Sequence, residues 1–234
     1  MENKKRGSFS GGIGFVLAAA GSAVGLGNLW RFPYLAAQYG GGIFILVYII
    51  LALTFGFTLM TTEIAIGRKT KLSPTRAYGN IDKRFAFIGP ISFIIPVIIL
   101  PYYCVIGGWV IKYVTVFATG QDMAAADSLF FANFIGQEYA PLVFFFIFLG
   151  LTALIVVLGV EKGIEKVSKY LMPVLILLAI VICIYIMFIP GAGAGIKYYL
   201  LPDFSKFSFK TVCAAMGQMF YSMSLAMGIM ITYG

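Results

Sequence analysis

The sequence predicts an all-α membrane protein that crosses the bilayer several times. Of its 234 residues, 61% are hydrophobic and 11% are charged, whereas a soluble domain is typically about 45–50% apolar and about 25% charged. Such an apolar excess does not fit inside one core of this size, because small proteins leave much of their surface exposed. The composition therefore excludes an ordinary soluble enzyme, a disordered chain and a nucleic-acid-binding protein.

Six uncharged runs supply the predicted helices. A spanning helix needs about 20 apolar residues, and backbone amides in lipid must bond within their own segment, so helices are expected rather than strands. The runs are Gly7–Trp30, Phe32–Thr62, Phe85–Ile111, Tyr139–Val160, Tyr170–Ile196 and Thr211–Gly234. We expect helices at about 10–37, 41–69, 85–118, 139–160, 163–189 and 208–234, all in one transmembrane unit, residues 1–234.

The distribution of Lys and Arg predicts the orientation of these helices. The N-terminus, the loop after the second helix and the loop between the fourth and fifth carry twelve basic residues, whereas the other side carries three. Cytoplasmic loops are enriched in Lys and Arg, so we expect a multi-pass protein of the cell membrane, plasma or inner, with a cytoplasmic N-terminus. The segments 120–138 and 191–210 are expected to be short outer loops.

Residues for catalysis are scarce. Histidine is absent from the sequence, which removes the usual catalytic base and a common zinc ligand. The three cysteines, Cys104, Cys183 and Cys213, lie far apart in or beside apolar runs, so we expect neither a metal site nor a disulfide framework there. The chain is therefore expected to be no enzyme and to have no organic cofactor.

Glycines and polar residues interrupt the first helix. Gly21, Gly25 and Gly27 fall within seven residues, and each glycine costs about 1 kcal/mol relative to alanine inside a helix. They favour either unwinding or close packing of helices through the pattern Gly21-x-x-x-Gly25. The amide of Asn28 and the guanidinium of Arg31 favour a functional break, because polar groups in a span are costly and are retained for function.

The sixth helix has a matching interruption. Gln218, Ser222 and Ser224 lie inside an apolar run between Gly217 and Gly228. A single serine in a membrane helix usually bonds back to its own carbonyls, but two serines and a glutamine at mid-span are unusual. Two interrupted helices are the best sequence indication of a secondary transporter's binding site. Helix N-termini at a break suit a carboxylate, and the freed carbonyls suit Na⁺.

These residues resemble a known family. The segment Gly21–Pro33 followed by Gly40–Gly42 closely resembles the first-helix signature of the neurotransmitter:sodium symporter family, and its bacterial amino-acid transporters in particular. Ordered motifs resembling the family's second, third, fifth and sixth helices follow. They are Glu63–Arg68, Tyr102-Tyr103 with Trp109, Gly163 with Pro173, and Gly217 to Ser224. The resemblance covers essentially the whole chain.

The resemblance implies a fold of two inverted repeats of five helices, usually with two further helices. This chain resembles helices 1–6 of that leucine-transporter-type fold, with helices 1 and 6 unwound at mid-membrane, and the second repeat is missing. An expected partner is the missing C-terminal half, from the same gene or a second chain. The alternative is a truncated, non-transporting half that needs a partner chain.

The resemblance also implies an amino-acid site. The amides of Leu26 and Gly27 and the hydroxyl of Tyr103 are expected to hold the substrate carboxylate, and Met227 to line an apolar side-chain pocket. The full expected set is Ala23, Leu26, Gly27, Tyr103, Tyr221, Ser222, Ser224 and Met227. The implied function is sodium-coupled symport of a hydrophobic L-amino acid by alternating access.

Na⁺ is the ion that the resemblance implies. The first sodium site is expected to use Ala23, Asn28 and Ser222, and the second the carbonyls of Gly21 and Val24. The other ligands belong to helices seven and eight of the family. Tyr48, Gln218 and Ser222 match three positions of the chloride site in animal members, but the deciding position is on helix seven, so chloride dependence stays undetermined.

Gates and supporting residues complete the implied set. The gates are Arg6, Arg31, Tyr103 and Tyr221, and the supporting residues are Glu63, Gln218, Gly163 and Pro173. Glu63 is expected to brace the unwound sixth helix, or else to snorkel at the inner interface near Arg68. Gly163 and Pro173 favour local unwinding of the fifth helix, or simply a kink, since proline cannot donate to the helical ladder.

Overall fold

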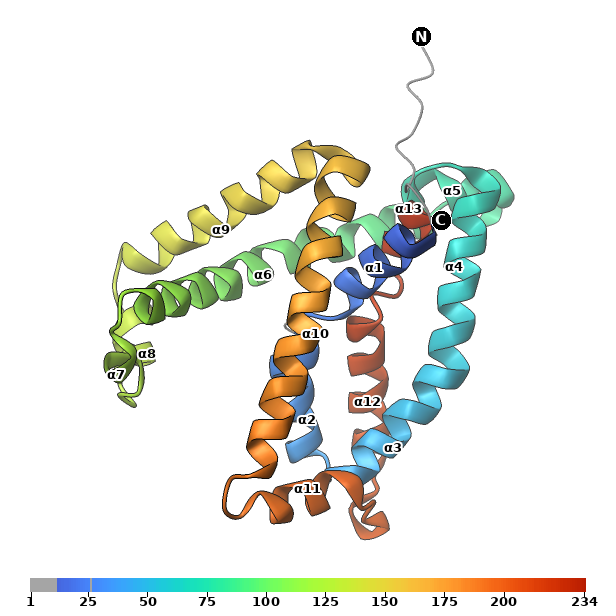
Figure 1. Cartoon of the computed structure of the whole chain (residues 1–234). Coiled ribbons are helices and arrows are strands. Elements are labelled where there is room, and N and C mark those ends of the chain that lie inside the picture. Colours follow the sequence, from blue (N-terminus) through green and yellow to red (C-terminus); the bar gives the residue numbers. More distant parts are fainter. Residues whose placement is uncertain (1–11, 26) are drawn as a thin grey trace. The chain divides into compact units, whose positions relative to one another are not determined.

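The computed structural model describes residues 12–25 and 27–234, which form helices and, within these residues, no strand. Contacts divide the chain into two compact units (Figure 1). The first contains the described residues up to Phe93 and those from Glu165 onward, and the second contains Ile94–Ile164. The predicted all-α class is confirmed, whereas the expectation of one transmembrane unit stays a prediction.

The first two predicted helices lie in the first unit. The first is interrupted and consists of α1 at Gly12–Ala23, a π-helical turn at Gly27–Arg31 and α2 at Phe32–Gln38. The second consists of α3 at Gly42–Leu51, a π-helical turn at Ala52–Gly56 and α4 at Phe57–Thr70. A left-handed Lys71, with φ of 53°, ends α4.

The rest of the first unit follows in two stretches. After α4 come α5 at Pro74–Ile81, a 3-10 turn at Lys83–Phe85 and the first residues of α6, which covers Ile88–Ala118. The later stretch contains α10 at Lys166–Met187, α11 at Ala192–Leu200, a 3-10 turn at Phe204–Lys206, α12 at Phe209–Ser222 and α13 at Ile229–Tyr233. The sixth predicted helix is therefore divided, as the first is.

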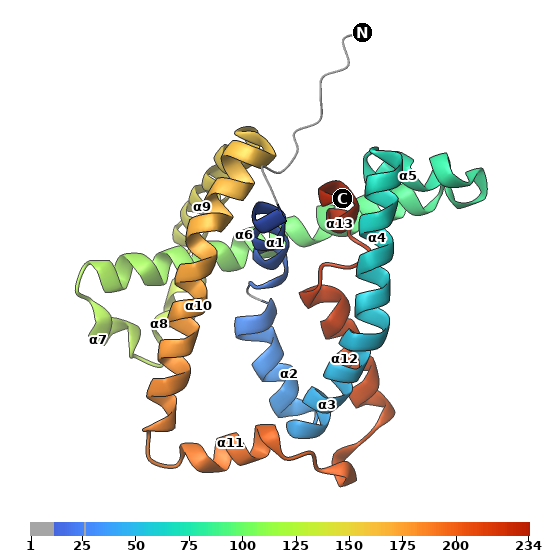
Figure 2. The same cartoon turned by 45° about the vertical axis from the view of Figure 1, so that its right-hand side comes forward.

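Close packing follows the second helix. α12 packs along α3 and α13 packs along α4 (Figure 2). Glycine at position 67 permits α13 to approach α4, because a β-carbon there would strike the Ile231 carbonyl. A β-carbon at Gly42, the first residue of α3, would lie 2.5 Å from the carbonyl oxygen of Leu201, which follows α11. Of the two parts of the first helix, α1 packs against α10.

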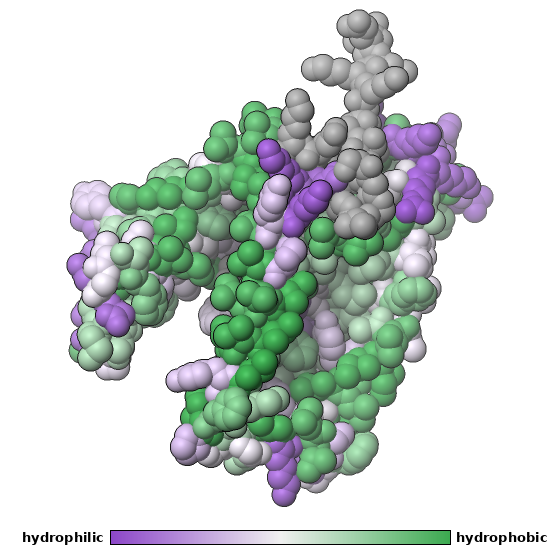
Figure 3. Space-filling view, in the orientation of Figure 1, coloured by the Kyte–Doolittle hydropathy of each residue, from purple (hydrophilic) through white to green (hydrophobic). Residues whose placement is uncertain are grey.

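Four helices of the described residues are long and apolar enough to cross a membrane. They are Gly42–Thr70, Lys83–Ala118, Ala140–Val157 and Gly163–Met187. The predicted first and sixth spans are not among them, because each is divided into shorter segments by its break. Large apolar side chains cover much of the exposed surface (Figure 3), which is what a lipid environment requires.

The expectation that the two outer segments are loops is partly wrong. The segment 120–138 contains α7 at Asp122–Ala125 and α8 at Phe130–Ile135, and the segment 191–210 contains α11. α11 is fixed by contacts distant in sequence, since the Tyr198 hydroxyl donates to the Ala37 carbonyl at 2.8 Å and the Tyr199 hydroxyl to the Pro33 carbonyl at 2.9 Å.

The second unit is organised around one half-buried cation. It comprises most of α6, then α7, α8 and α9 at Ala140–Val157. The ammonium of Lys112 in α6 lies 5.6–5.9 Å from the ring centroids of Phe130, Phe134 and Phe144. Aromatic faces attract a cation at this distance, so Lys112 joins α6 to both α8 and α9.

Replacing Lys112 with methionine is expected to destabilise the second unit by about 0.5–2 kcal/mol, the range for a partly desolvated cation–π contact. Methionine keeps a similar length and loses the charge, whereas Lys112→Arg should keep most of the stability. Thermal unfolding in detergent measures the difference. Equal midpoints for Lys112→Met and Lys112→Arg would show that the rings hold the side chain by its apolar stem alone.

Candidate functional site

The break in the first helix is closed by a side chain. α1 ends at Ala23, and the Asn28 side-chain amide donates to the Ala23 carbonyl across the break at 2.7 Å. The backbone N–H groups of Asn28 and Leu29 both donate to the Gly25 carbonyl, at 3.0 and 3.1 Å. The break is therefore a compact turn in which the Ala23 carbonyl faces an amide instead of a helical N–H.

Left-handed residues form the break in the sixth helix. Ser224, Ala226 and Gly228 have φ of 53°, 61° and 72°, a region that costs a non-glycine residue of order 1 kcal/mol. The Leu225 N–H donates to the Phe220 carbonyl at 3.0 Å, and the Ala226 N–H donates to Glu63 Oε1 at 2.7 Å. The break is thus held partly by the second helix.

Gln218 joins the two breaks to each other. Its amide nitrogen donates to the Gly27 carbonyl at 2.9 Å, and its amide oxygen accepts from Arg31 Nη1 at 3.3 Å. The Arg31 guanidinium also lies 5.0 Å from the centroid of the Tyr221 ring. Gln218 is fully buried, so this bridge fixes the register between the turn after α1 and the end of α12.

Two buried hydroxyl groups adjoin the bridge. The hydroxyls of Tyr48 and Ser222 are 2.7 Å apart, and both Ser222 and Ser224 are buried. Hydroxyl and carbonyl oxygens are the hard ligands that alkali and alkaline-earth cations accept. No cluster of three or more His, Cys, Asp or Glu that could hold a metal occurs within the described residues, so a cation here would be bound by neutral oxygens.

Glu63 of α4 contacts the sixth-helix break and is buried. Its Oε1 accepts from Ala226, while no side chain or amide of the described residues donates to its Oε2. Burial first, and then the charge of Glu63, raise the pKa of the Tyr78 phenol above its ordinary value, and a hydrogen bond with Ser92 opposes that rise. The tyrosine therefore stays a neutral hydroxyl beside the carboxylate.

Replacing Glu63 with leucine is expected to lower stability by about 1–3 kcal/mol, because the half-buried Ala226 N–H then loses its acceptor. Glu63→Gln keeps a carbonyl oxygen in place and should recover most of the loss. Glu138 is an exposed carboxylate of the second unit, and Glu138→Leu serves as the matched control. Thermal midpoints that are equal for the two leucine variants would contradict the bracing role.

The structure brings most of the predicted residues together. Those gathered around the two breaks in the first unit are Gly21, Ala23, Val24, Gly27, Asn28, Arg31, Glu63, Gln218, Tyr221, Ser222, Ser224 and Met227. Tyr103 belongs to the second unit, where its ring lies 6.0 Å from that of Tyr102. The predicted positions Arg6 and Leu26 lie outside the described residues.

Gly163 lies at an irregular turn, whereas Pro173 lies within a regular helix. Gly163 lies in a π-helical turn at Val160–Glu165, where an added β-carbon would strike the Ile155 carbonyl. Pro173 lies inside the continuous helix α10. The predicted irregularity of the fifth helix therefore coincides with Gly163, and α10 runs through Pro173 without a break.

Sequence reasoning missed two residues of the site. Tyr78, which lies near the charge of Glu63, comes from α5, and Ser92, which is hydrogen-bonded to Tyr78, comes from the start of α6. A β-carbon at Gly228 would lie 2.6 Å from Pro74 and 4.0 Å from Ser92, so α5 is packed directly on the break. The sequence holds no signal for these contacts, because α5 reads as part of a basic loop.

A family model described as the sodium:neurotransmitter symporter family matches residues 6–126 and 132–234. The chain is 35% identical to the uncharacterized sodium-dependent transporter YhdH of Bacillus subtilis and 37% identical to an uncharacterized sodium-dependent transporter of Methanocaldococcus jannaschii. Each alignment covers 100% of this chain, but 53% and 50% of those relatives. The chain therefore spans about half the length of the curated relatives it matches.

A solved structure is similar to this chain in both fold and sequence. The crystal structure of MhsT in complex with L-phenylalanine superposes with a TM-score of 0.91 at 36% identity, over 97% of this chain and 53% of that one.

Proposed function

Because the chain belongs to the sodium:neurotransmitter symporter family, we propose that it forms one half of a membrane transporter that couples Na⁺ to an amino acid. The observation that carries the proposal is the bridge from Gln218 to the Gly27 carbonyl at 2.9 Å. It holds two helix breaks face to face, so that carbonyls and N–H groups freed from both helices can share one ligand.

A first sodium ion is proposed to bind between Ala23, Asn28 and Ser222. The Asn28 amide and the Ala23 carbonyl already meet at 2.7 Å. On binding, the amide would turn its oxygen to the ion and exchange this hydrogen bond for coordination. The carbonyls of Gly21 and Val24 are proposed for a second ion, with the remaining ligands of both supplied by the other half of the transporter.

The substrate is proposed to be a hydrophobic L-amino acid. Its carboxylate would meet the amides of Leu26 and Gly27 and the Tyr103 hydroxyl. Its amino group would meet the carbonyls of Ala23 and Tyr221 and the hydroxyl of Ser224. Met227 gives an adaptable apolar lining. The L-phenylalanine in the MhsT structure supports this substrate class.

Transport is proposed to proceed by alternating access. The Arg31 guanidinium over the Tyr221 ring, at 5.0 Å, suits an outer gate that closes over the substrate, and Arg6 is proposed for the inner gate. The N-terminus would lie in the cytoplasm and the protein in the plasma or inner membrane. The second half of the binding site would come from the same polypeptide or from a second chain.

Uptake into proteoliposomes tests this proposal with the complete gene product. Radiolabelled L-phenylalanine should accumulate when external Na⁺ is present and should not when choline replaces it. Replacing chloride with gluconate would measure the undetermined chloride dependence in the same assay. The intact mass of the purified protein tells whether one polypeptide or two chains form the transporter. Equal uptake in Na⁺ and choline would refute sodium coupling.

A further inference from the structure

A basic hollow lies at the end of the first unit that carries α11, apart from the helix breaks. Two adjoining cavities of about 320 and about 560 Å³ share the lining residues Gly40, Tyr198 and Lys206. The first also contains Lys197 and the second Lys210. These are the three lysines that the sequence places on the less basic side of the membrane.

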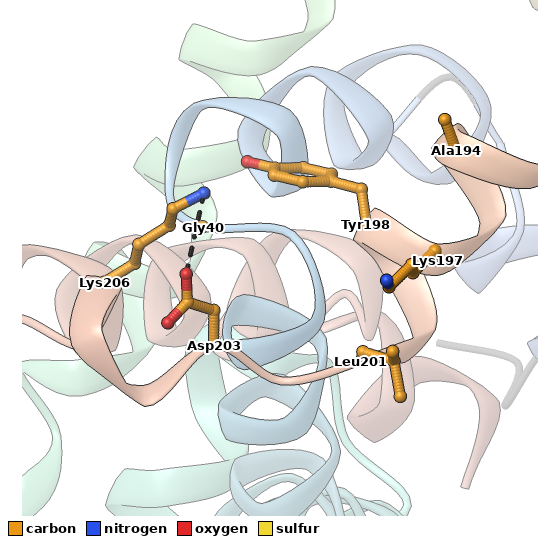
Figure 4. A pocket seen from close by; sticks show the side chains of 7 residues that line it. All are labelled: Gly40, Ala194, Lys197, Tyr198, Leu201, Asp203 and Lys206. Carbon is orange, nitrogen blue, oxygen red and sulfur yellow. Dashed lines mark ion pairs between the residues drawn. The ribbon is translucent and has the colours of Figure 1, made fainter.

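The charge of this hollow is strongly positive. Asp203 is the one acid among its described lining residues, set against three lysines. Hydrogen bonds from the Ser205 hydroxyl and N–H lower the pKa of Asp203, so its carboxylate stays ionised at neutral pH. The Lys206 ammonium lies 3.8 Å from Asp203 Oδ2 (Figure 4). Within the described residues, neither Lys197 nor Lys210 forms an ion pair.

The Lys206 side chain is held in place by an aromatic ring. Its ammonium lies 5.0 Å from the centroid of the Tyr198 ring, which faces it in Figure 4. Tyr198 is itself fixed by its hydrogen bond to the Ala37 carbonyl. Lys206 lines both cavities, and one weak contact with a carboxylate leaves its ammonium able to bind a further anion.

The chain segment 200–209, which supplies part of the lining, carries exposed apolar side chains that we call the rim of the hollow; Leu201 among them lines the first cavity. Leu200, Leu201, Phe204, Phe207 and Phe209 are each more than half exposed. They alternate along the chain with Lys197, Lys206 and Lys210. In Figure 3 a few hydrophilic residues at this end are surrounded by hydrophobic surface. Lysine beside exposed leucine and phenylalanine is typical of segments that lie in a membrane interface.

We propose that this hollow binds an anionic phospholipid, with the lipid phosphate between Lys206 and the lysines beside it. The acyl chains would lie against the exposed phenylalanine and leucine side chains of the rim. A soluble anion would use the same lysines but would leave the apolar rim in water. Charge complementarity with an apolar rim therefore favours a lipid, and the site is independent of the proposed transport site.

Binding of phosphatidylglycerol to the purified complete protein in a neutral detergent tests this inference. Phosphatidylcholine serves as the uncharged-headgroup comparison and inorganic phosphate as the soluble one. We expect phosphatidylglycerol to bind about tenfold more tightly than phosphatidylcholine at low salt, given the attraction of clustered lysines for anionic lipid. Inorganic phosphate should neither bind at comparable concentration nor displace the lipid.

Three variants locate the site. Combining Lys197→Gln, Lys206→Gln and Lys210→Gln should remove the tenfold preference, and the corresponding triple Lys→Arg variant should keep it. The matched control, Lys83→Gln with Lys166→Gln and Lys169→Gln, removes three exposed lysines that lie elsewhere and should also keep it. A preference that survives the first variant would overturn the inference. Competition by inorganic phosphate at lipid concentrations would overturn it too, in favour of a soluble anion.

Discussion

Replacing Asn28 with alanine is expected to weaken sodium-dependent uptake by about 100-fold, because a lost bond to an ion costs up to about 3 kcal/mol. Asn28 is the side chain that closes the break in the first helix, through its 2.7 Å bond with the Ala23 carbonyl. Alanine removes both this cross-link and the proposed ligand oxygen. The measurement is uptake against Na⁺ concentration, where the half-saturating concentration should rise.

Two further variants make the Asn28 result specific. Asn28→Asp keeps an oxygen at the same position and should lose less uptake than alanine does. Asn133 is an exposed amide in the second unit, so Asn133→Ala should behave as the unaltered protein. An unchanged sodium dependence in Asn28→Ala would remove Asn28 from the proposed site, even if uptake itself were confirmed.

Replacing Gly27 with alanine should destabilise the site by about 1–3 kcal/mol, the usual cost of overpacking a well-packed position. A β-carbon at Gly27 would lie 2.5 and 2.7 Å from two atoms of the Tyr221 ring. That ring lies beneath Arg31, and Arg31 contacts Gln218, so a shift of the ring disturbs the whole bridge. Thermal unfolding without substrate should show a midpoint several degrees lower.

The neighbouring glycine provides the matched control for this stability measurement. A β-carbon at Gly25 would meet no atom within 4 Å, so Gly25→Ala should change the midpoint little. Combining Gly27→Ala with Tyr221→Leu removes the ring edge and should recover part of the loss. If Gly25→Ala and Gly27→Ala unfold at the same temperature, the contact with Tyr221 does not limit this position.

The two helix breaks could be predicted because their own residues carry the signal. Clustered glycines with Asn28 and Arg31, and serines with Gln218, are unfavourable in a plain membrane helix. Both breaks and the family membership are confirmed. The ligand roles of these residues stay predictions, since they depend on ions, a substrate and the proposed second half.

Other features depend on contacts that a sequence does not display. Ser224 and Ala226 are left-handed although neither is a glycine, and the Glu63 carboxylate holds Ala226 from another helix. The segment that contains α11 is expected from the sequence to be a loop. It is an ordered helix because two tyrosine hydroxyls fix it to carbonyls more than a hundred residues earlier. In each case long-range packing, rather than local propensity, decides the backbone.

The hydrogen bonds that hold the two breaks also constrain the order in which the helices fold during synthesis. Gln218 meets Gly27 across 191 residues, and Glu63 meets Ala226 across 163. During synthesis the first helix therefore enters the membrane long before its Gln218 partner has been made. An unsatisfied carbonyl in hydrocarbon costs several kcal/mol, so we expect the nascent first helix to stay continuous at first. Its break then forms only when the sixth helix arrives, and defects in the sixth helix become defects in the first.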